Sequence, residues 1–135
     1  MIKYKEGYRC QTTEEWSQYT GIIPPQLIKN RYFELDPEGR LTIYIGFAWD
    51  GATSCPEWLV PKECSAPHDA LCQCMRVGLL DYDVYAPQVH GLLRKMVAER
   101  RGDIIAWGVY QAVTLARGGH PDNAEGNPER CDPPV

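Results

Sequence analysis

Two short blocks of the sequence concentrate the side chains that could perform chemistry. Residues 47–54 read FAWDGATS, and residues 66–73 read APHDALCQ. Carboxylates and imidazoles are the ligands that borderline divalent metals such as zinc accept in proteins. The four candidate metal ligands are Asp50, His68, Asp69 and His90.

The same residues are also candidates for general acid–base catalysis. Asp50 or Asp69 could orient the imidazole of His68 and tune its pKa. Gly51 permits a tight turn beside such a site, and Ser54 offers a hydroxyl. A structural interpretation stays open, because an acid is stabilised in the first turn of a helix and an inward histidine is often a hydrogen-bonded core residue.

Several familiar catalytic classes lack their motifs in this chain. The sequence has no Gly-x-Ser-x-Gly elbow, no P-loop and no Gly-x-Gly-x-x-Gly. His68 is the first histidine, so the upstream histidine of a metal-dependent phosphohydrolase of the His-Asp type is missing. A cysteine–histidine pair stays conceivable, with Cys55 or Cys72 beside His68 or His90.

The six cysteines raise the question of a zinc site or disulfides. Cys64, His68 and Cys72 follow an i, i+4, i+8 spacing, but Pro67 favours the first helical turn, which would place Cys64 before the helix. Cys72 and Cys74 lack the C-x-x-C spacing of a zinc knuckle. Without a secretion signal we expect reduced thiols, and the sequence does not determine whether Cys10 and Cys131 meet.

Composition limits the size of the protein and the kinds of partner. The 135 residues, 44% of them hydrophobic, suffice for one domain with a small core. The net charge of −4 offers no basic face for nucleic acid. No stretch approaches the roughly 20 apolar residues of a membrane span. We therefore expect no nucleic-acid partner and no membrane span.

The first half of the chain has the pattern of strands and turns. Residues 32–35 and 41–45 are rich in β-formers and flank the Pro- and Gly-containing turn 36–40, which predicts a hairpin. Further short strands are expected at 2–4 and 8–10. Single helical turns are expected at Thr13–Trp16 and Pro25–Ile28.

The second half predicts three helices. The first should begin at an N-cap on Ser65 and run to about Val77, with His68 on its apolar stripe and therefore pointing inward. The second should begin at Pro87 and run to about Arg100, with His90 at the edge of an apolar arc. The third, capped by Asp103, should end at 117–119. Its expected buried residues are Ile105, Val109, Ala112, Val113 and Ala116.

These elements predict an α+β fold in which an N-terminal β-hairpin or small antiparallel sheet packs on three C-terminal helices. Residues 1–117 form the expected single domain, with a pocket where 49–54 meet the His68 helix. Residues 118–135 form a Pro- and Gly-rich C-terminal tail that cannot build its own core. Such a tail is ordered when it docks on its own domain or on a neighbouring chain.

The two blocks resemble the WDGAS and HDALYQ signatures of a phage-associated family of small uncharacterised proteins, and the resemblance covers residues 31–119. Two positions depart from the family pattern. Cys72 replaces an aromatic residue, and His90 lies where the family tends to carry an aspartate. The signature positions are Trp49, Asp50, Gly51, Ser54, His68, Asp69 and Arg76.

The resemblance implies a phage-encoded accessory or structural component of the virion, associated with the tail, neck or fibre. Its expected partners are other phage structural proteins or further copies of itself, and its expected location is the virion or the host cytoplasm. The alternative is a metal-dependent hydrolase that acts on cell wall or another host polymer. Its expected catalytic residues are Asp50, His68 and Asp69, with a divalent metal such as zinc as cofactor.

Overall fold

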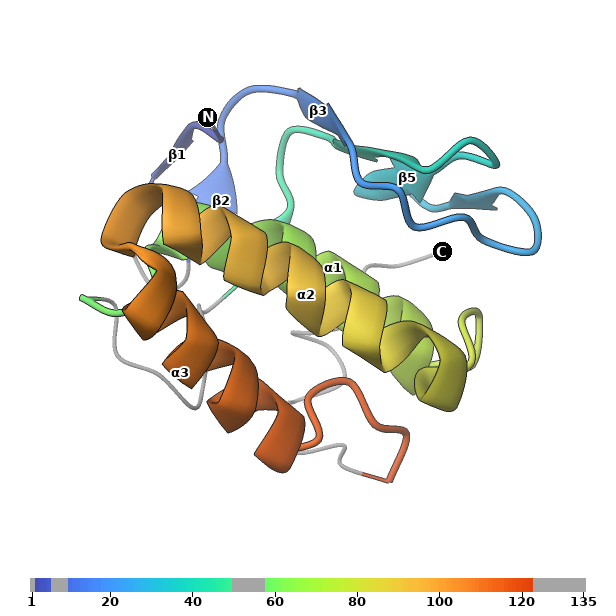
Figure 1. Cartoon of the computed structure of the whole chain (residues 1–135). Helices are drawn as coiled ribbons and strands as arrows, with labels where there is room; N and C mark the ends of the chain where they lie inside the picture. The colour runs from blue at the N-terminus through green and yellow to red at the C-terminus, as the bar shows by residue number, and fades with distance from the viewer. Residues whose placement is uncertain (1, 6–9, 50–57, 123–135) are drawn as a thin grey trace.

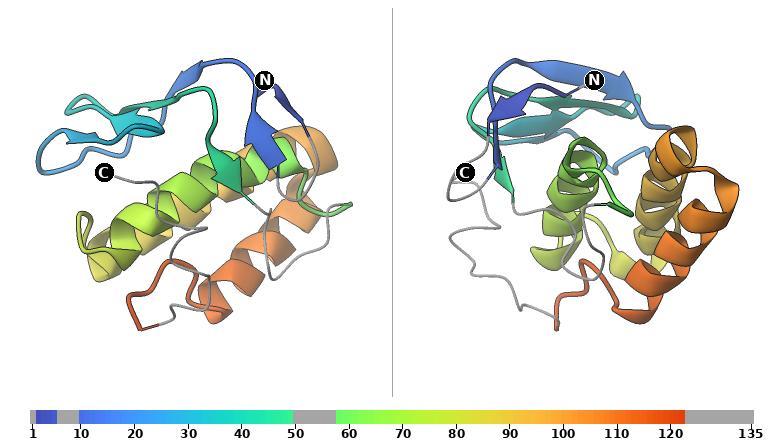
Figure 2. Two further views of the ribbon diagram at one scale, coloured as in Figure 1. Left: turned by 180° about the vertical axis from the view of Figure 1, so that it is seen from behind. Right: turned by 90° about the vertical axis from the view of Figure 1, so that its left-hand side faces the viewer.

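The computed structural model describes residues 2–5, 10–49 and 58–122. Its strands lie along one side of helices α1 (Lys62–Arg76) and α2 (Tyr82–Arg101), and helix α3 (Asp103–Leu115) lies farthest from the strands (Figures 1 and 2). Helix α2 packs against both α1 and α3. The predicted α+β class, with N-terminal strands and C-terminal helices, is confirmed.

The predicted hairpin forms the centre of the larger sheet. Strand β5 (Phe33–Leu35) pairs antiparallel with β6 (Arg40–Ile43), with Leu35 opposite Leu41. In the turn, Asp36 Oδ1 accepts hydrogen bonds from the backbone N–H groups of Glu38 and Arg40, both at 2.9 Å. The turn residues therefore fix the hairpin locally, as their types predict.

Two further strands complete this sheet, and both correct a sequence prediction. The helical turns predicted at Thr13–Trp16 and Pro25–Ile28 are wrong, because β3 (Trp16–Tyr19) and β4 (Ile28–Lys29) extend the hairpin on its two sides. β3 pairs with β6, and β4 pairs with β5. Pairing with strands distant in sequence overrides the local propensity of such short segments.

The smaller sheet brings the first sequence block to the helices. Its strand order is β1 (Tyr4–Lys5), β2 (Cys10–Thr12) and β7 (Ala48–Trp49), all antiparallel, with Cys10 opposite Trp49. Tyr4 and Cys10 belong to the strands expected at 2–4 and 8–10, and residues 8 and 9 lie outside the described residues. Strand β7 ends at Trp49, directly before Asp50.

Helices α1 and α2 both begin earlier than predicted, at Lys62 and Tyr82. Pro67 and Pro87, predicted for first turns, are each the sixth residue of their helix. Proline at this position gives up a bond only to the second residue of the helix, whose carbonyl can tilt toward solvent. Ser65 is therefore not the N-cap of α1.

A side chain that the prediction passed over caps α2. Asp81 Oδ2 accepts a hydrogen bond from Val84 N at 3.2 Å. For α3 the predicted capping role of Asp103 is wrong, since Gly102 is the N-cap and Asp103 the first helical residue, without a side-chain capping bond. The buried residues of α3 are Ala106, Val109 and Val113, whereas Ala116 is exposed.

Both sheets and all three helices contribute to one hydrophobic core. Its largest fully buried side chains include Trp49, Phe33 and Phe47, with the Phe47 and Trp49 rings stacked at 6.0 Å between centroids. The strands thus pack on α1 through aromatic side chains. Among the described helices, none combines the length and apolar character needed to cross a bilayer.

Candidate functional site: a buried histidine pair

The second sequence block places His68 against His90. α1 and α2 run antiparallel side by side (Figure 1), and His68 Nε2 lies 2.9 Å from His90 Nδ1. The exposed fractions are 8% for His68 and 1% for His90. The prediction that His68 points inward is therefore confirmed, and two of the four candidate metal ligands meet.

Cys72 lies one helical turn beyond His68 and joins the pair. Its Sγ is 3.6 Å from His68 Nε2 and 3.8 Å from His68 Nδ1. With two neutral rings, one ring nitrogen donates across the 2.9 Å contact and the other accepts. In either arrangement His90 Nε2 stays buried without a hydrogen-bond partner among the described residues.

Both imidazoles are held in the neutral form. Burial lowers the pKa of His68 to about 3, and the nearby His90 and Arg76 charges act in the same direction. Burial alone lowers the pKa of His90 to about 4. Two protonated imidazoles at hydrogen-bond distance would repel each other strongly, because no water screens their charges in the interior. The pair therefore carries no charge near neutral pH.

The turn after α3 covers the histidine pair. A methyl group on Gly118 would lie 3.3 Å from His90 Cε1 and 3.8 Å from His68 Cε1. Gly119 has φ +84, and a methyl group there would lie 3.1 Å from Cys72 Cα. Two consecutive glycines thus allow the backbone to lie directly on the rings. The next residue, His120, contacts the Tyr82 ring edge to face at 4.7 Å.

Arg76 and Gln73 present unpaired polar atoms on α1. Arg76 Nε and Nη1 and both amide atoms of Gln73 are buried without hydrogen-bond partners among the described residues. Gln73 is 2% exposed. The positive charge of Arg76 lies near enough to His68 to oppose protonation of its ring. The Arg76 charge therefore favours the neutral form of His68.

The described residues do not by themselves form a metal site. The two histidine nitrogens face each other at hydrogen-bond distance, and the parts of the chain that the structure describes hold no group of three His, Cys, Asp or Glu side chains placed around one point. Asp69 is half-buried on α1. Asp50, Gly51 and Ser54 lie outside the described residues. The four-ligand site therefore stays a prediction.

The zinc interpretation of Cys64, His68 and Cys72 fails for a reason other than the predicted one. Cys64 lies within α1, not before it, but eight residues of α-helix separate it from Cys72 by about 12 Å along the axis. Two thiolates cannot share one zinc at that separation. Burial raises the pKa of Cys64 to about 11 and that of Cys74 to about 12, so both stay thiols.

The first block is anchored to α1 through Trp49. Its indole Nε1 donates to the carbonyl oxygen of Lys62 at 2.9 Å and to Ser65 Oγ at 3.1 Å. The ring is fully buried. Ser65 Oγ in turn donates to the Lys62 carbonyl at 2.8 Å. This network fixes the position of Trp49, the last residue of β7, relative to the helix that carries His68.

Sequence reasoning missed three contributors to this site. Gly118 and Gly119 were assigned to the end of a helix, and Tyr82 was not assigned a role. The signal that could have found the glycines is their pairing, since a single glycine suffices for a helix C-terminus. No local pattern marks Tyr82, because its contact with His120 joins the first residue of α2 to the turn after α3, 38 positions later in the sequence.

Comparisons with known proteins add no assignment to this geometry. No protein-family model matches the chain, and neither the curated proteins nor the solved structures searched yield a match.

Proposed function

We propose that this chain is a phage-encoded structural or accessory component of the virion, built to assemble with other phage proteins. The proposal unites the signature resemblance with one surface property of the fold. The outward face of α3 is apolar: the exposed fractions are 87% for Ile104, 54% for Trp107 and 81% for Leu115. Exposed apolar side chains gathered on one element are typical of contact surfaces.

The helical spacing makes this a continuous strip. Ile104, Trp107 and Leu115 recur at three and eight residues, which places them on one side of α3, opposite the buried Ala106, Val109 and Val113. Exposed apolar side chains contribute no burial free energy to the isolated fold. A partner protein that covers the strip would remove this apolar surface from water and so stabilise the complex.

In this proposal the histidine pair is an internal structural element. It is buried and neutral, and the Gly118–Gly119 turn covers it. A general acid or base needs a pKa near the working pH and access to substrate. Values of about 3 and about 4 in a covered position suit packing between α1 and α2 better than proton transfer.

The test is to look for the protein in purified particles of the phage that encodes it, by quantitative mass spectrometry. The chain should be present in the particles. The variant Ile104→Ser/Leu115→Ser should be depleted from them while still folded. Ile45→Ser is the matched control, because Ile45 is 64% exposed but lies outside α3. A wild-type chain missing from the particles would contradict the proposal.

The alternative is a metal-dependent hydrolase, supported by the meeting of His68 and His90. In this case the pair would open to admit a divalent ion, with Asp50 and Asp69 as further ligands. Elemental analysis of purified protein should then find close to one equivalent of a divalent metal, lost in Asp50→Ala and His68→Ala. Metal-free protein with the pair intact would exclude this alternative.

A further inference from the structure

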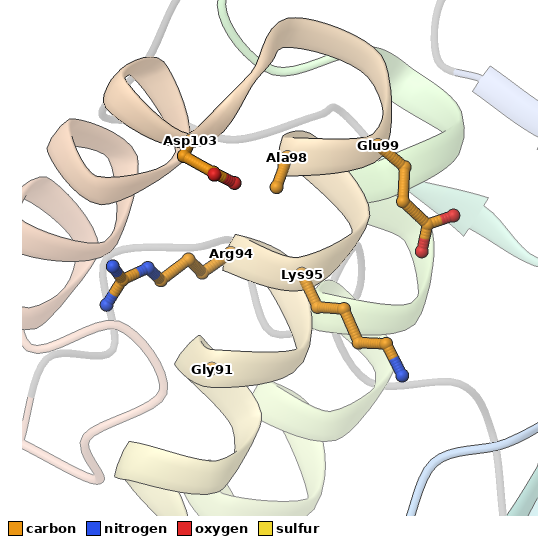
Figure 3. Close-up of a pocket in the computed structure, with 6 residues that line it drawn as sticks. All are labelled: Gly91, Arg94, Lys95, Ala98, Glu99 and Asp103. Atoms are coloured by element: carbon orange, nitrogen blue, oxygen red, sulfur yellow. The ribbon is translucent and has the colours of Figure 1, made fainter.

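An open groove lies on the outer side of α2, beside the start of α3. Its volume is about 500 Å³. Figure 3 shows its lining residues, of which Gly91 has no side chain and Ala98 only a methyl group. A methyl group on Gly91 would meet nothing within 4 Å. The groove therefore leaves the α2 backbone open to close approach by another helix.

Four charged side chains flank the groove in a regular pattern. Arg94 and Asp103 project from one side of it, and Lys95 and Glu99 project from the other (Figure 3). On each side the positive group lies nearer the start of α2 and the negative group nearer its end. All four are exposed, and no ion pair among the described residues involves them.

This pattern is complementary to itself. Consider a two-fold axis that lies in the plane of this face, perpendicular to α2, near Ala98. It reverses the direction of α2 in the second copy, but each flank of the groove faces the same flank of that copy. It brings Arg94 opposite Asp103 of a second copy, and Lys95 opposite Glu99 of that copy. Each contact occurs twice, as an isologous interface requires.

We propose that this face is the interface of a two-fold homodimer in which the α2 helices pair antiparallel across Ala98. The occupant of the groove is a second copy of this chain. A strongly acidic or basic partner would place like charge opposite two of these four side chains. The same face on another copy instead places an opposite charge against each of the four. Arg94 also lies over the Tyr110 ring at 5.6 Å, which holds its guanidinium on the α3 side of the groove.

This inference goes beyond the proposed virion role and does not depend on it, because the isolated full-length chain should dimerise in the absence of any phage component. Sedimentation equilibrium over a range of protein concentrations measures the dissociation constant. Dimerisation should weaken as salt rises, since the contacts are charged and near the surface.

Charge exchange provides the decisive variants. Lys95→Glu alone and Glu99→Lys alone should each weaken homodimerisation at least about tenfold, because each places like charges opposite one another twice. An equimolar mixture of the two variants should form a heterodimer with wild-type affinity, since every contact is then between opposite charges. The controls Lys3→Glu and Glu38→Lys make the same charge changes at exposed positions outside the groove.

Three results would overturn the proposal. The wild-type chain could stay monomeric at the highest concentration reached. It could dimerise with no response to either groove variant. The two variants could each fail to dimerise and also fail to pair in the mixture although both are folded by circular dichroism.

Discussion

His68 and His90 face each other across the contact between α1 and α2, with Nε2 of one ring 2.9 Å from Nδ1 of the other. Each histidine thus satisfies a buried polar atom of its neighbour. Because the two come from different helices, the contact fixes how α1 and α2 lie against each other at this level. The pair couples helix packing to the protonation state of its rings.

Removing either imidazole ring should lower stability, because the remaining buried ring then lacks its hydrogen-bond partner. We expect His68→Ala to lower the free energy of unfolding by about 1–3 kcal/mol, as for other buried hydrogen-bonded groups. Urea unfolding of His68→Ala, His90→Ala and the double variant forms a double-mutant cycle. The coupling energy should exceed about 0.5 kcal/mol. Simple additivity of the two single variants would show that the contact contributes nothing.

Acidification should destabilise the fold through the same pair. Histidine in the unfolded chain titrates near 6.5, whereas the folded pKa values are about 4 for His90 and about 3 for His68. Below about pH 6.5 the unfolded chain therefore binds protons that the folded chain does not, so stability falls as pH decreases. The loss continues down to the folded pKa values, at up to about 1.4 kcal/mol per pH unit for each histidine.

Urea unfolding at about pH 7.5 and about pH 5 measures this slope. The His68→Ala/His90→Ala variant is the control, because it keeps every carboxylate of the chain. Its stability should depend less on pH than that of the wild type. Equal pH dependence in the two proteins would contradict the lowered pKa values.

The turn over the histidines should not tolerate a side chain at Gly119. Its φ of +84 is unfavourable for any other residue, and a methyl group would lie 2.6 Å from Met75 Cε and 3.1 Å from Cys72 Cα and Cβ. Gly119→Ala should therefore destabilise the protein by more than about 1 kcal/mol. Thermal unfolding provides the comparison with a matched variant.

Gly108→Ala is that matched variant. Gly108 lies inside α3 with a negative φ, and nothing lies within 4 Å of the added methyl group. Alanine is the better helix former, so this change should stabilise the protein by up to about 1 kcal/mol. Equal effects of the two substitutions would mean that the turn does not lie on α1 as described.

The anchor of the first block should depend on the indole nitrogen of Trp49. Trp49→Phe keeps the aromatic packing but removes the donor to the Lys62 carbonyl and Ser65 Oγ. We expect a loss of about 1–2 kcal/mol in the free energy of unfolding. Trp16→Phe should cost less, because Trp16 is half-buried on β3 and its indole has no such bond to the part of the chain that the structure describes. The reverse order would argue against the anchor.

The fold class and the hairpin could be predicted because their signals are local. Asp36 and Gly39 define the turn by their own backbone preferences, and the helices carry clear apolar periodicity. The strand at Trp16–Tyr19 could not be predicted, because its pairing with β6 joins residues more than 20 positions apart. The early starts of α1 and α2 were missed because Pro67 and Pro87 favour first turns but do not require them.

For the site, the helical spacing predicted only which side chains of one helix point inward. The i, i+4 spacing of His68 and Cys72 on an apolar stripe indicated that both point inward, and the structure agrees. That His90 would be the partner of His68 depends on how α1 and α2 are rotated against each other, which no local pattern specifies. The expected partners Asp50 and Asp69 come from the block spacing, and Asp50 lies outside the described residues.

The most direct test of this account is the protonation of the two buried rings, read from the ¹⁵N chemical shifts of their nitrogens by NMR. At about pH 6 we expect both His68 and His90 to be neutral, each in a single tautomer. One nitrogen of the facing pair should be protonated and the other bare. Two protonated nitrogens on either ring at that pH, or shifts that move on addition of zinc, would contradict a sealed structural pair.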